Sequence, residues 1–363
     1  MSALRDIIAA NGPVWLAIGG LVIGMAFGAI VFATNFCTMG AISDIVTLGD
    51  WRRFRAWLLA AATALLGAQI LHWVGAVDLA ASMYLSPTLN WTGNIAGGLM
   101  FGFGMVFAGG CPSRNLARVG GGDLRALMVL LVLGIFAYMA MGGILGPLRA
   151  ALEQTTSMAL AAPTQGLGDI LAGTFGATAG TGRLVASAVV IAAVLAYCFG
   201  GAGFRTSPVH IWSGIGIGLC AVAGWALTGL AFDEMSDRPT QPISLTYVRP
   251  TADAIEWLER YTAARLPGFG VATVFGAILG AFLVAVAKGR YRVTGFADTS
   301  DMLRSLMGAM LMGAGGVMAL GCTIGQGITG VSTLALGSFL TFAAIVTGGV
   351  AGVKALERWL MAQ

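Results

Sequence analysis

Two stretches of the sequence, Gly97–Cys111 (GGLMFGFGMVFAGGC) and Gly308–Cys322 (GAMLMGAGGVMALGC), decide the fold. Set 211 residues apart, they match at their spaced glycines, at a valine, at an alanine and at the final cysteine. Each reads as an apolar helix that ends in Gly-Cys, followed by a short polar stretch and another apolar run. Small residues at this spacing let helix backbones approach closely in a membrane. The sequence therefore predicts an all-α membrane protein with an internal repeat.

The composition supports a membrane protein and excludes several other classes. Hydrophobic residues make up 57% of the 363-residue chain and charged residues 10%, whereas about a quarter of an average soluble domain is charged. An ordinary soluble enzyme is excluded. The 55 glycines show no collagen period, and no Lys/Arg cluster combines with aromatics to make a nucleic-acid-binding face.

Apolar runs long enough to cross a bilayer core of about 30 Å predict about nine transmembrane helices. They fall at approximately 14–33, 54–75, 94–110, 123–147, 184–200, 211–231, 268–287, 303–320 and 331–353. We interpret residues 1–363 as a single transmembrane domain with repeat one at about 14–147, a connecting span at 184–200 and repeat two at about 211–353.

The odd number of spans gives the two repeats opposite topologies. Because the first copy starts outside and the second starts inside, we expect them to be related by an axis in the membrane plane, as in transporters with inverted repeats. A fainter match, 194 residues apart, pairs Gly20 with Gly214 and Gly24 with Gly218, and places Cys37 opposite Ala231.

Basic residues set the predicted orientation. With the N-terminus outside, most Lys and Arg residues fall on the cytoplasmic side, as the positive-inside rule requires. We therefore expect a multi-pass protein of the bacterial inner membrane with a periplasmic N-terminus and a cytoplasmic C-terminus. The basic residues on the cytoplasmic side are Arg52, Arg53, Arg55, Arg114, Arg118, Arg125, Arg205, Lys288, Arg290, Arg292, Arg304, Lys354 and Arg358.

Two long outside loops carry further elements. Residues 232–267 hold six acidic side chains, and a short helix capped by Thr251 is predicted to lie along the membrane surface. Residues 148–182 include a glycine-rich stretch at 166–180 that is too short to span, and it is predicted to be re-entrant or interfacial.

Three helix interruptions each contain a cysteine: residues 34–40 (TNFCTMG), 109–115 (GGCPSRN) and 321–327 (GCTIGQG). Pro112 suits the first position of a helix, so Cys111 is expected at the N-cap, where free N–H groups favour an anion. The same geometry is expected for Cys37 and Cys322. The five cysteines form no C-x-x-C pair. Cys198 and Cys220 lack a break and are predicted to pack as small apolar side chains.

These three cysteine motifs resemble the YeeE/YedE family of bacterial inner-membrane sulfur-compound transporters, whose studied members take up thiosulfate. The resemblance covers nearly the whole chain. It implies an hourglass-shaped protein with loops that dip inward from both faces, and a permeation path lined by Cys37, Cys111 and Cys322. It also implies a small cytoplasmic TusA-like sulfurtransferase as partner. No cofactor, metal or catalytic activity is expected.

The chemistry of these residues suits a small sulfur anion such as thiosulfate. Neutral thiols are weak donors that can pass a soft sulfur along, while helix N-termini and hydroxyls bind the oxygens. Weak sites in series also let the ion leave. The supporting polar residues are Thr38, Ser113, Asn115, Thr323 and Gln326, with Arg114 as an attractor at the cytoplasmic mouth or as an ordinary positive-inside marker.

Two other functions compete with transport of a sulfur anion. A membrane sulfurtransferase or thiol redox protein would use a cysteine persulfide or disulfide, against which the missing C-x-x-C pair argues. Soft-metal transport would require sulfur ligands, including Met39, to be grouped by folding.

Overall fold

The computed structural model describes residues 8, 11–176, 178–232, 241–263 and 265–361, and its regular secondary structure is almost entirely helical. The long helices are α2 (Gly12–Thr34), α4 (Arg52–Trp73), α7 (Leu124–Met141), α10 (Ala179–Phe199), α12 (Pro208–Leu230), α14 (Phe269–Ala287), α15 (Thr299–Met318) and α16 (Leu336–Met361).

The shorter elements connect these helices. They are α3 (Thr38–Ser43), α5 (Gly98–Phe107), α6 (Pro112–Gly120), α8 (Gly146–Thr156), α9 (Leu167–Phe175), α11 (Ala202–Arg205) and α13 (Arg249–Glu259), the 3-10 turn η2 (Leu79–Ala81), and the π-helical turns η1 (Asp44–Leu48), η3 (Gly93–Gly97) and η4 (Gly325–Gly330). The strands β1 (Thr88–Leu89) and β2 (Met158–Ala159) pair antiparallel.

The polytopic helical fold is confirmed. Within the described part of the chain, eight helical stretches are long and apolar enough to cross a membrane. Helix α15 occupies the eighth predicted span but falls outside this set, because its first turns contain Asp301 and Arg304. The third predicted span, 94–110, is η3 and α5; the chain then breaks at residues 108–111 before α6.

Glycines allow the long helices to pack at backbone contact. A Cβ atom at Gly24 would lie 2.4 Å from the Thr273 carbonyl oxygen of α14, and one at Gly218 would lie 2.7 Å from the Ala60 carbonyl oxygen of α4. The pairs α2–α14 and α12–α4 therefore repeat the same contact, since Gly24 and Gly218 are the residues that the fainter sequence match pairs.

Helices α5 and α15 cross each other through the glycines of the decisive repeat. A Cβ at Gly104 would lie 2.6 Å from the Gly308 carbonyl oxygen, and a Cβ at Gly97 would lie 2.7 Å from that of Gly315. Gly104 corresponds to Gly315 and Gly308 to Gly97 at the offset of 211 residues, so the two contacts are equivalent in the repeat. This is the pattern that a twofold axis through the crossing produces. The division of the whole chain into two inverted repeats remains a prediction.

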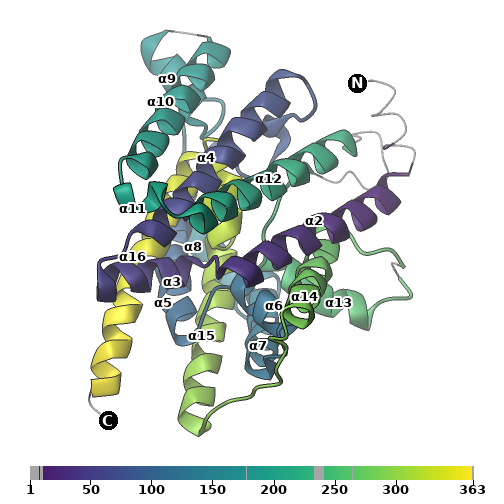
Figure 1. Cartoon of the computed structure of the whole chain (residues 1–363). Coiled ribbons are helices and arrows are strands. Elements are labelled where there is room, and N and C mark those ends of the chain that lie inside the picture. Colours follow the sequence, from purple (N-terminus) through teal and green to yellow (C-terminus); the bar gives the residue numbers. More distant parts are fainter. Residues whose placement is uncertain (1–7, 9–10, 177, 233–240, 264, 362–363) are drawn as a thin grey trace.

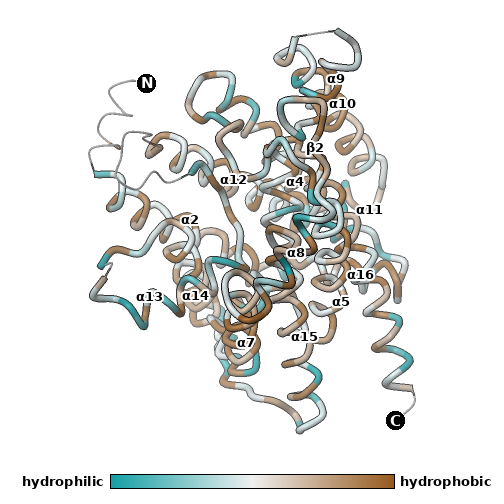
Figure 2. The backbone as a smooth tube through the Cα atoms, turned by 180° about the vertical axis from the view of Figure 1, so that it is seen from behind, coloured by the Kyte–Doolittle hydropathy of each residue, from teal (hydrophilic) through white to brown (hydrophobic). Residues whose placement is uncertain are grey.

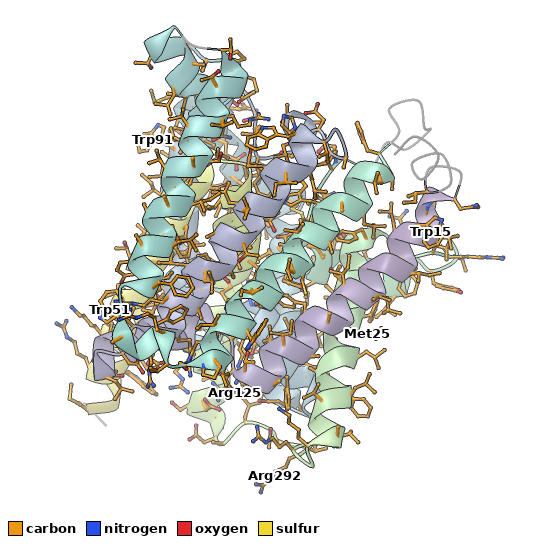
Figure 3. The ribbon with its side chains drawn as sticks, turned by 45° about the horizontal axis from the view of Figure 1, so that its top comes forward. Trp15, Met25, Trp51, Trp91, Arg125 and Arg292 are labelled. Carbon is orange, nitrogen blue, oxygen red and sulfur yellow. The ribbon has the colours of Figure 1, made fainter. Side chains whose placement is uncertain are left out.

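Helix α2 begins on one side of the molecule, near the N-terminus, and α16 ends on the opposite side, near the C-terminus (Figure 1). The hydrophobic colouring follows the long helices, whereas hydrophilic stretches gather at α13, at the start of α15 and at the end of α16 (Figure 2). Trp15 marks one side, and Arg125 and Arg292 lie toward the other (Figure 3). The arginine face is the side of the molecule that carries segments 35–51, 109–123 and 288–298. The loop face is the side that carries segments 74–92, 142–166 and 241–248.

The loop face is built differently from the sequence-based expectation. Helix α13 begins at Arg249 after Val248, with Pro250 in its first turn; Thr251 is not its cap, since its hydroxyl donates back to the Tyr247 carbonyl oxygen at 2.6 Å. The segment Gln241–Val248 has no regular secondary structure and is mostly buried. The stretch 166–180 contributes α9, which packs against α10.

Candidate functional site

Each of the three cysteines predicted to line the path stands immediately before a helical stretch. The Gly40 N–H donates to the Cys37 sulfur at 3.4 Å, and the Gly325 N–H donates to the Cys322 sulfur at 3.3 Å. Cys111 is the N-cap residue of α6, and its sulfur lies 3.2 Å from the Ser113 hydroxyl. The thiol thus takes the place of an N-cap oxygen at Cys37 and Cys322. The polarity of each helix start faces the sulfur, which favours a bound anion there.

The fold brings these cysteines together. All three are buried, at 7%, 1% and 0% exposure for Cys37, Cys111 and Cys322. The Cys37 and Cys111 thiols are close enough to interact electrostatically, and Cys322 lies within electrostatic range of Cys111. Residues 285 positions apart in the sequence therefore form one sulfur cluster, which we call the thiol cluster (Cys37, Cys111 and Cys322).

The turns that carry Cys111 and Cys322 have the same backbone hydrogen bonds. The Gly110 N–H donates to the Met105 carbonyl oxygen and the Gly321 N–H to that of Gly316, each at 2.8 Å. Both glycines have positive φ, of 149° and 157°. A side chain is strained in this conformation, so glycine is required at both turns.

Asn115 and Gln326 occupy equivalent places and hold the two turns. The Asn115 amide donates to the Gly110 carbonyl oxygen at 2.9 Å, and the Gln326 amide donates to the Ala319 carbonyl oxygen at 2.6 Å. The Gln326 carbonyl oxygen also accepts from the Ser338 hydroxyl. Both side chains are buried and already bonded within the protein, so they position the turns.

Of the three hydroxyl side chains predicted to support the path, one has a hydrogen-bond partner and two have none. The Ser113 hydroxyl lies 3.2 Å from the Cys111 sulfur. The Thr38 and Thr323 hydroxyls are buried, and neither has a hydrogen-bond partner. Thr323 also lies beside the Cys111 thiol. Two unused donors thus border the thiol cluster, and an unused buried donor is costly unless a ligand engages it.

Arg114 lies on the arginine face, at the end of the thiol cluster. Its Nη2 donates to the Asn35 side-chain oxygen at 2.9 Å, in an exposed position. The guanidinium is close enough to the Cys37 thiol to act on it electrostatically. An exposed cation beside the first cysteine suits an attractor for anions.

Two cavities open on the loop face and meet at the turn before Cys322. One, of about 270 Å³, is lined mainly by hydroxyl and amide side chains, with Tyr84, Gln326 and Leu320 among them. The other, of about 530 Å³, is bordered by residues 241–250 and by Leu320 and Gly321. Access from this face therefore leads to the residues directly before Cys322.

Sequence reasoning missed the buried segment Gln241–Val248. The Thr329 hydroxyl donates to the Leu245 carbonyl oxygen at 2.6 Å, and the Ser244 hydroxyl donates to that of Ala221 at 2.5 Å. The Tyr247 backbone lies close to the Cys322 sulfur. The only signal in the sequence is a group of hydroxyl residues, Ser244 to Tyr247, within a loop read as surface.

The two remaining cysteines stay outside the thiol cluster. The Cys198 sulfur donates to the Arg55 carbonyl oxygen at 3.3 Å, and Cys220 lies within α12. All five cysteines, each in the described part of the chain, are free. Among described residues, no group of three His, Cys, Asp or Glu side chains is arranged to hold a metal ion.

Comparison with known proteins identifies the family to which this chain belongs. The family profile described as sulphur transport matches residues 33–351, a range that contains all three cysteine turns. The chain belongs to the sulphur-transport (YeeE/YedE) family. This confirms the resemblance that the cysteine motifs indicated.

Two curated relatives match along most of their length. The thiosulfate transporter TsuA of Spirochaeta thermophila is 28% identical over 337 residues, which cover 91% of this chain and 96% of the relative. The thiosulfate transporter TsuA of Escherichia coli is 28% identical over 338 residues, or 86% and 87% of the two chains. The probable transporter YedE of Escherichia coli matches over 107 residues, 29% of this chain.

Proposed function

We propose that this protein imports thiosulfate, or a closely related small sulfur anion, by passing it along Cys37, Cys111 and Cys322. The observation that carries the proposal is the thiol cluster, in which three N-cap cysteines from distant segments converge between the two faces. Support comes from two thiosulfate transporters that are similar over nearly their whole length.

The thiol cluster suits transient contact with a doubly charged ion. A fixed arginine at the constriction would hold such an anion too tightly to release it, whereas thiols are weak donors. Backbone N–H groups at the helix starts and the free hydroxyls of Thr38 and Thr323 supply donors for the oxygens. The soft terminal sulfur of thiosulfate then contacts the thiols in turn.

Direction follows from the charge on the two faces. Under the predicted orientation the arginine face, which contains Arg114, is cytoplasmic, and the cavities on the loop face open to the periplasm. The anion enters through the cavities, contacts Cys322 first and leaves past Cys37 and Arg114. The same face would present the anion to a cytoplasmic TusA-like sulfurtransferase.

The test is uptake of radiolabelled thiosulfate into proteoliposomes by cysteine variants. Cys37→Ala, Cys111→Ala and Cys322→Ala are each expected to reduce the rate at least tenfold. Cys198→Ala, which removes a buried thiol outside the cluster, should leave the rate unchanged. Full uptake by a variant that lacks all three cluster cysteines would overturn the proposal.

The competing function, a sulfurtransferase or thiol redox protein, makes a different prediction for the same preparation. A cysteine persulfide or disulfide would accumulate during turnover and add mass to a cysteine peptide. Passage by hydrogen bonding leaves all five cysteines unmodified. Mass spectrometry of the protein after sustained uptake therefore distinguishes the two functions, and a modified cluster cysteine would favour the enzyme.

A further inference from the structure

The two cavities on the loop face differ in the charge of their linings. Arg149 and Arg249 line the larger cavity, together with Asp253. Glu153 lines the smaller cavity, and the described residues around that cavity include no Lys, Arg or His. The Arg149 Nη1 lies 2.6 Å from a Glu153 carboxylate oxygen, so this ion pair has its cation on the larger cavity and its carboxylate on the smaller. The larger cavity is therefore the better environment for an anion.

The charged groups of the larger cavity are held by the protein. Asp253 lies 3.5 Å from the Arg249 Nε and accepts from the Tyr138 hydroxyl at 2.8 Å. The Arg149 Nε donates to the Ala140 carbonyl oxygen at 2.7 Å, which fixes this guanidinium at the end of α7. The carboxylate is thus already paired, and the cation of Arg149 stays in one place.

The inner end of the larger cavity reaches the turn before Cys322. Leu320 and Gly321 line it there, and so does Thr246. Thr246 is 8% exposed, and within the described part of the chain its hydroxyl has no hydrogen-bond partner. A hydroxyl largely removed from water is unfavourable without a partner, and native proteins seldom leave one unbonded. The Thr246 hydroxyl is thus an unused donor at the inner end of the cavity.

The Thr246 hydroxyl also lies against the helix start that follows Cys322. A Cβ atom at Gly325 would lie 2.4 Å from the Thr246 Oγ1, and the Gly325 N–H donates to the Cys322 sulfur at 3.3 Å. Because a Cβ position is about 2.5 Å from its own backbone nitrogen, the Thr246 Oγ1 lies within about 5 Å of the nitrogen that binds this sulfur. A side chain at residue 325 would take the place of the hydroxyl, so glycine is required there.

The start of helix α14 adds backbone donors to the same cavity. Phe269 and Gly270, the first two residues of α14, line it, and no side chain caps this helix. The first N–H groups of a helix have no partner within it, and they favour an anion. Cations, a free hydroxyl and a helix start therefore border one space.

These groups stand at different depths. The Arg249 side chain is 73% exposed and the Arg149 side chain 22% exposed, whereas Thr246 is 8% exposed. An anion that enters from the loop face would meet the arginines first and the hydroxyl last. The order leads from long-range attraction to one directed hydrogen bond beside the Cys322 turn.

We propose that the larger cavity is the vestibule that binds the sulfur anion before it reaches Cys322, with Arg249 and Arg149 as attracting cations and the Thr246 hydroxyl as the innermost donor. The inference rests on the proposed function and deepens it, because it assigns the entry route and a binding residue. One oxygen of the anion accepts from Thr246, and its soft sulfur then contacts the Cys322 thiol. No covalent step occurs. The smaller cavity, lined by Glu153, lies off this route.

The first experiment measures uptake of radiolabelled thiosulfate by Thr246 variants in proteoliposomes over a range of concentrations. Thr246→Val keeps the shape of the side chain and removes its hydroxyl, and it is expected to raise the KM about tenfold, as the loss of one hydrogen bond to a charged group does. Thr246→Ser keeps the hydroxyl and should restore most of the affinity. Thr88→Val is the matched control, because Thr88 lines only the smaller cavity, and its KM should stay at the wild-type value.

The second experiment tests the attracting charge at the mouth of the vestibule. Arg249→Gln should raise the KM about threefold at low ionic strength, the usual scale for an exposed charge, and the difference should vanish at high salt. Arg260→Gln is the matched control: Arg260 is also an exposed arginine at an end of α13, paired with a carboxylate four residues away, but it does not line the cavity. Its KM should equal that of wild type at both salt concentrations.

Thermal unfolding in detergent gives a readout that does not depend on transport. Because the Thr246 hydroxyl has no partner in the protein, Thr246→Val should melt within about 2 °C of wild type without ligand. Added thiosulfate should raise the melting temperature of the wild type more than that of Thr246→Val. Thr88→Val should show the wild-type shift.

The outcomes separate this inference from the proposed function. Absence of thiosulfate uptake by the wild-type protein would overturn the proposed function. Wild-type uptake with an unchanged KM and an unchanged thiosulfate-induced shift in Thr246→Val would overturn the vestibule alone, and so would a raised KM in Thr88→Val only. An equal rise in KM for Thr246→Ser and Thr246→Val would show that the hydroxyl is not the donor. Equal KM values for Arg249→Gln and Arg260→Gln at low salt would exclude the attracting role of Arg249.

Discussion

The crossing of α5 and α15 should respond equally to a methyl group added from either side. In Gly104→Ala the new Cβ would lie 2.6 Å from the Gly308 carbonyl oxygen, whereas ordinary contact begins at 3.4 Å. In Gly308→Ala it would lie 2.6 Å from the Gly104 carbonyl oxygen and 2.5 Å from the Ala108 backbone nitrogen. The atoms that obstruct it are backbone, so the two helices must separate by about 0.8 Å to relieve either clash.

The loss in free energy of unfolding can be bounded from the known effects of overpacking and of helix propensity. Overpacking of a close-packed interface costs about 1–3 kcal/mol, and the better helix propensity of alanine returns about 0.5–1 kcal/mol. Each single variant should therefore lose about 1–2 kcal/mol, or a few degrees in melting temperature. Because one separation accommodates both methyl groups, the double variant should lose less than the sum of the two single losses.

The assay is thermal unfolding in detergent followed by tryptophan fluorescence. Gly173→Ala is the control, since a Cβ there meets nothing within 4 Å in α9, and it should melt at or slightly above the wild-type temperature. Wild-type melting of both crossing variants would refute the reasoning. Equally, strict additivity in the double variant would show that the two glycines do not share one contact.

Two carboxylates give further predictions. The Asp301 carboxylate contacts Arg125 at 3.0 Å and Arg304 at 2.5 Å, and its side chain is only 10% exposed. Asp301→Asn should lower the free energy of unfolding by about 2–4 kcal/mol in chemical denaturation, because two cations lose their partner. Wild-type stability of this variant would contradict the prediction. Burial raises the pKa of Asp253, so its ionised form destabilises the fold above that pKa, and the effect disappears as the pH falls below the unfolded value. Asp253→Asn should therefore raise the melting temperature at pH 7 and converge with wild type by about pH 3; a constant difference across this range would exclude the mechanism.

The sequence was informative where local pattern determines structure. Spaced glycines before Cys111 and Cys322 indicate both the apolar helix and its break, because glycine is needed for close packing and for positive φ at Gly110 and Gly321. The common offset shows that the two turns are alike. The chemical role of each cysteine remains a prediction that uptake measurements must test.

The buried position of the segment Gln241–Val248 could not be found in this way. The segment that carries Tyr247 has no helical period, and its burial depends on contacts with Thr329 and Ala221, far away in the sequence. Matching the repeat at 194 residues placed Cys37 opposite Ala231, because that register holds for α2 and α12 only. The extra chain after α12 changes the register before α13 begins.

One difference between the two cysteine turns has a consequence for water and ions. Gly109 has a positive φ of 74° in the first turn, and Leu320 has one of 56° in the second. The space beside Gly109 is taken by the guanidinium groups of Arg118 and Arg125. Leu320 instead places an apolar side chain between the two cavities, in a conformation that costs about 1–2 kcal/mol. An ion that approaches from the loop face would therefore meet an apolar side chain before Cys322, whereas one that approaches Cys111 from the arginine face would meet guanidinium groups.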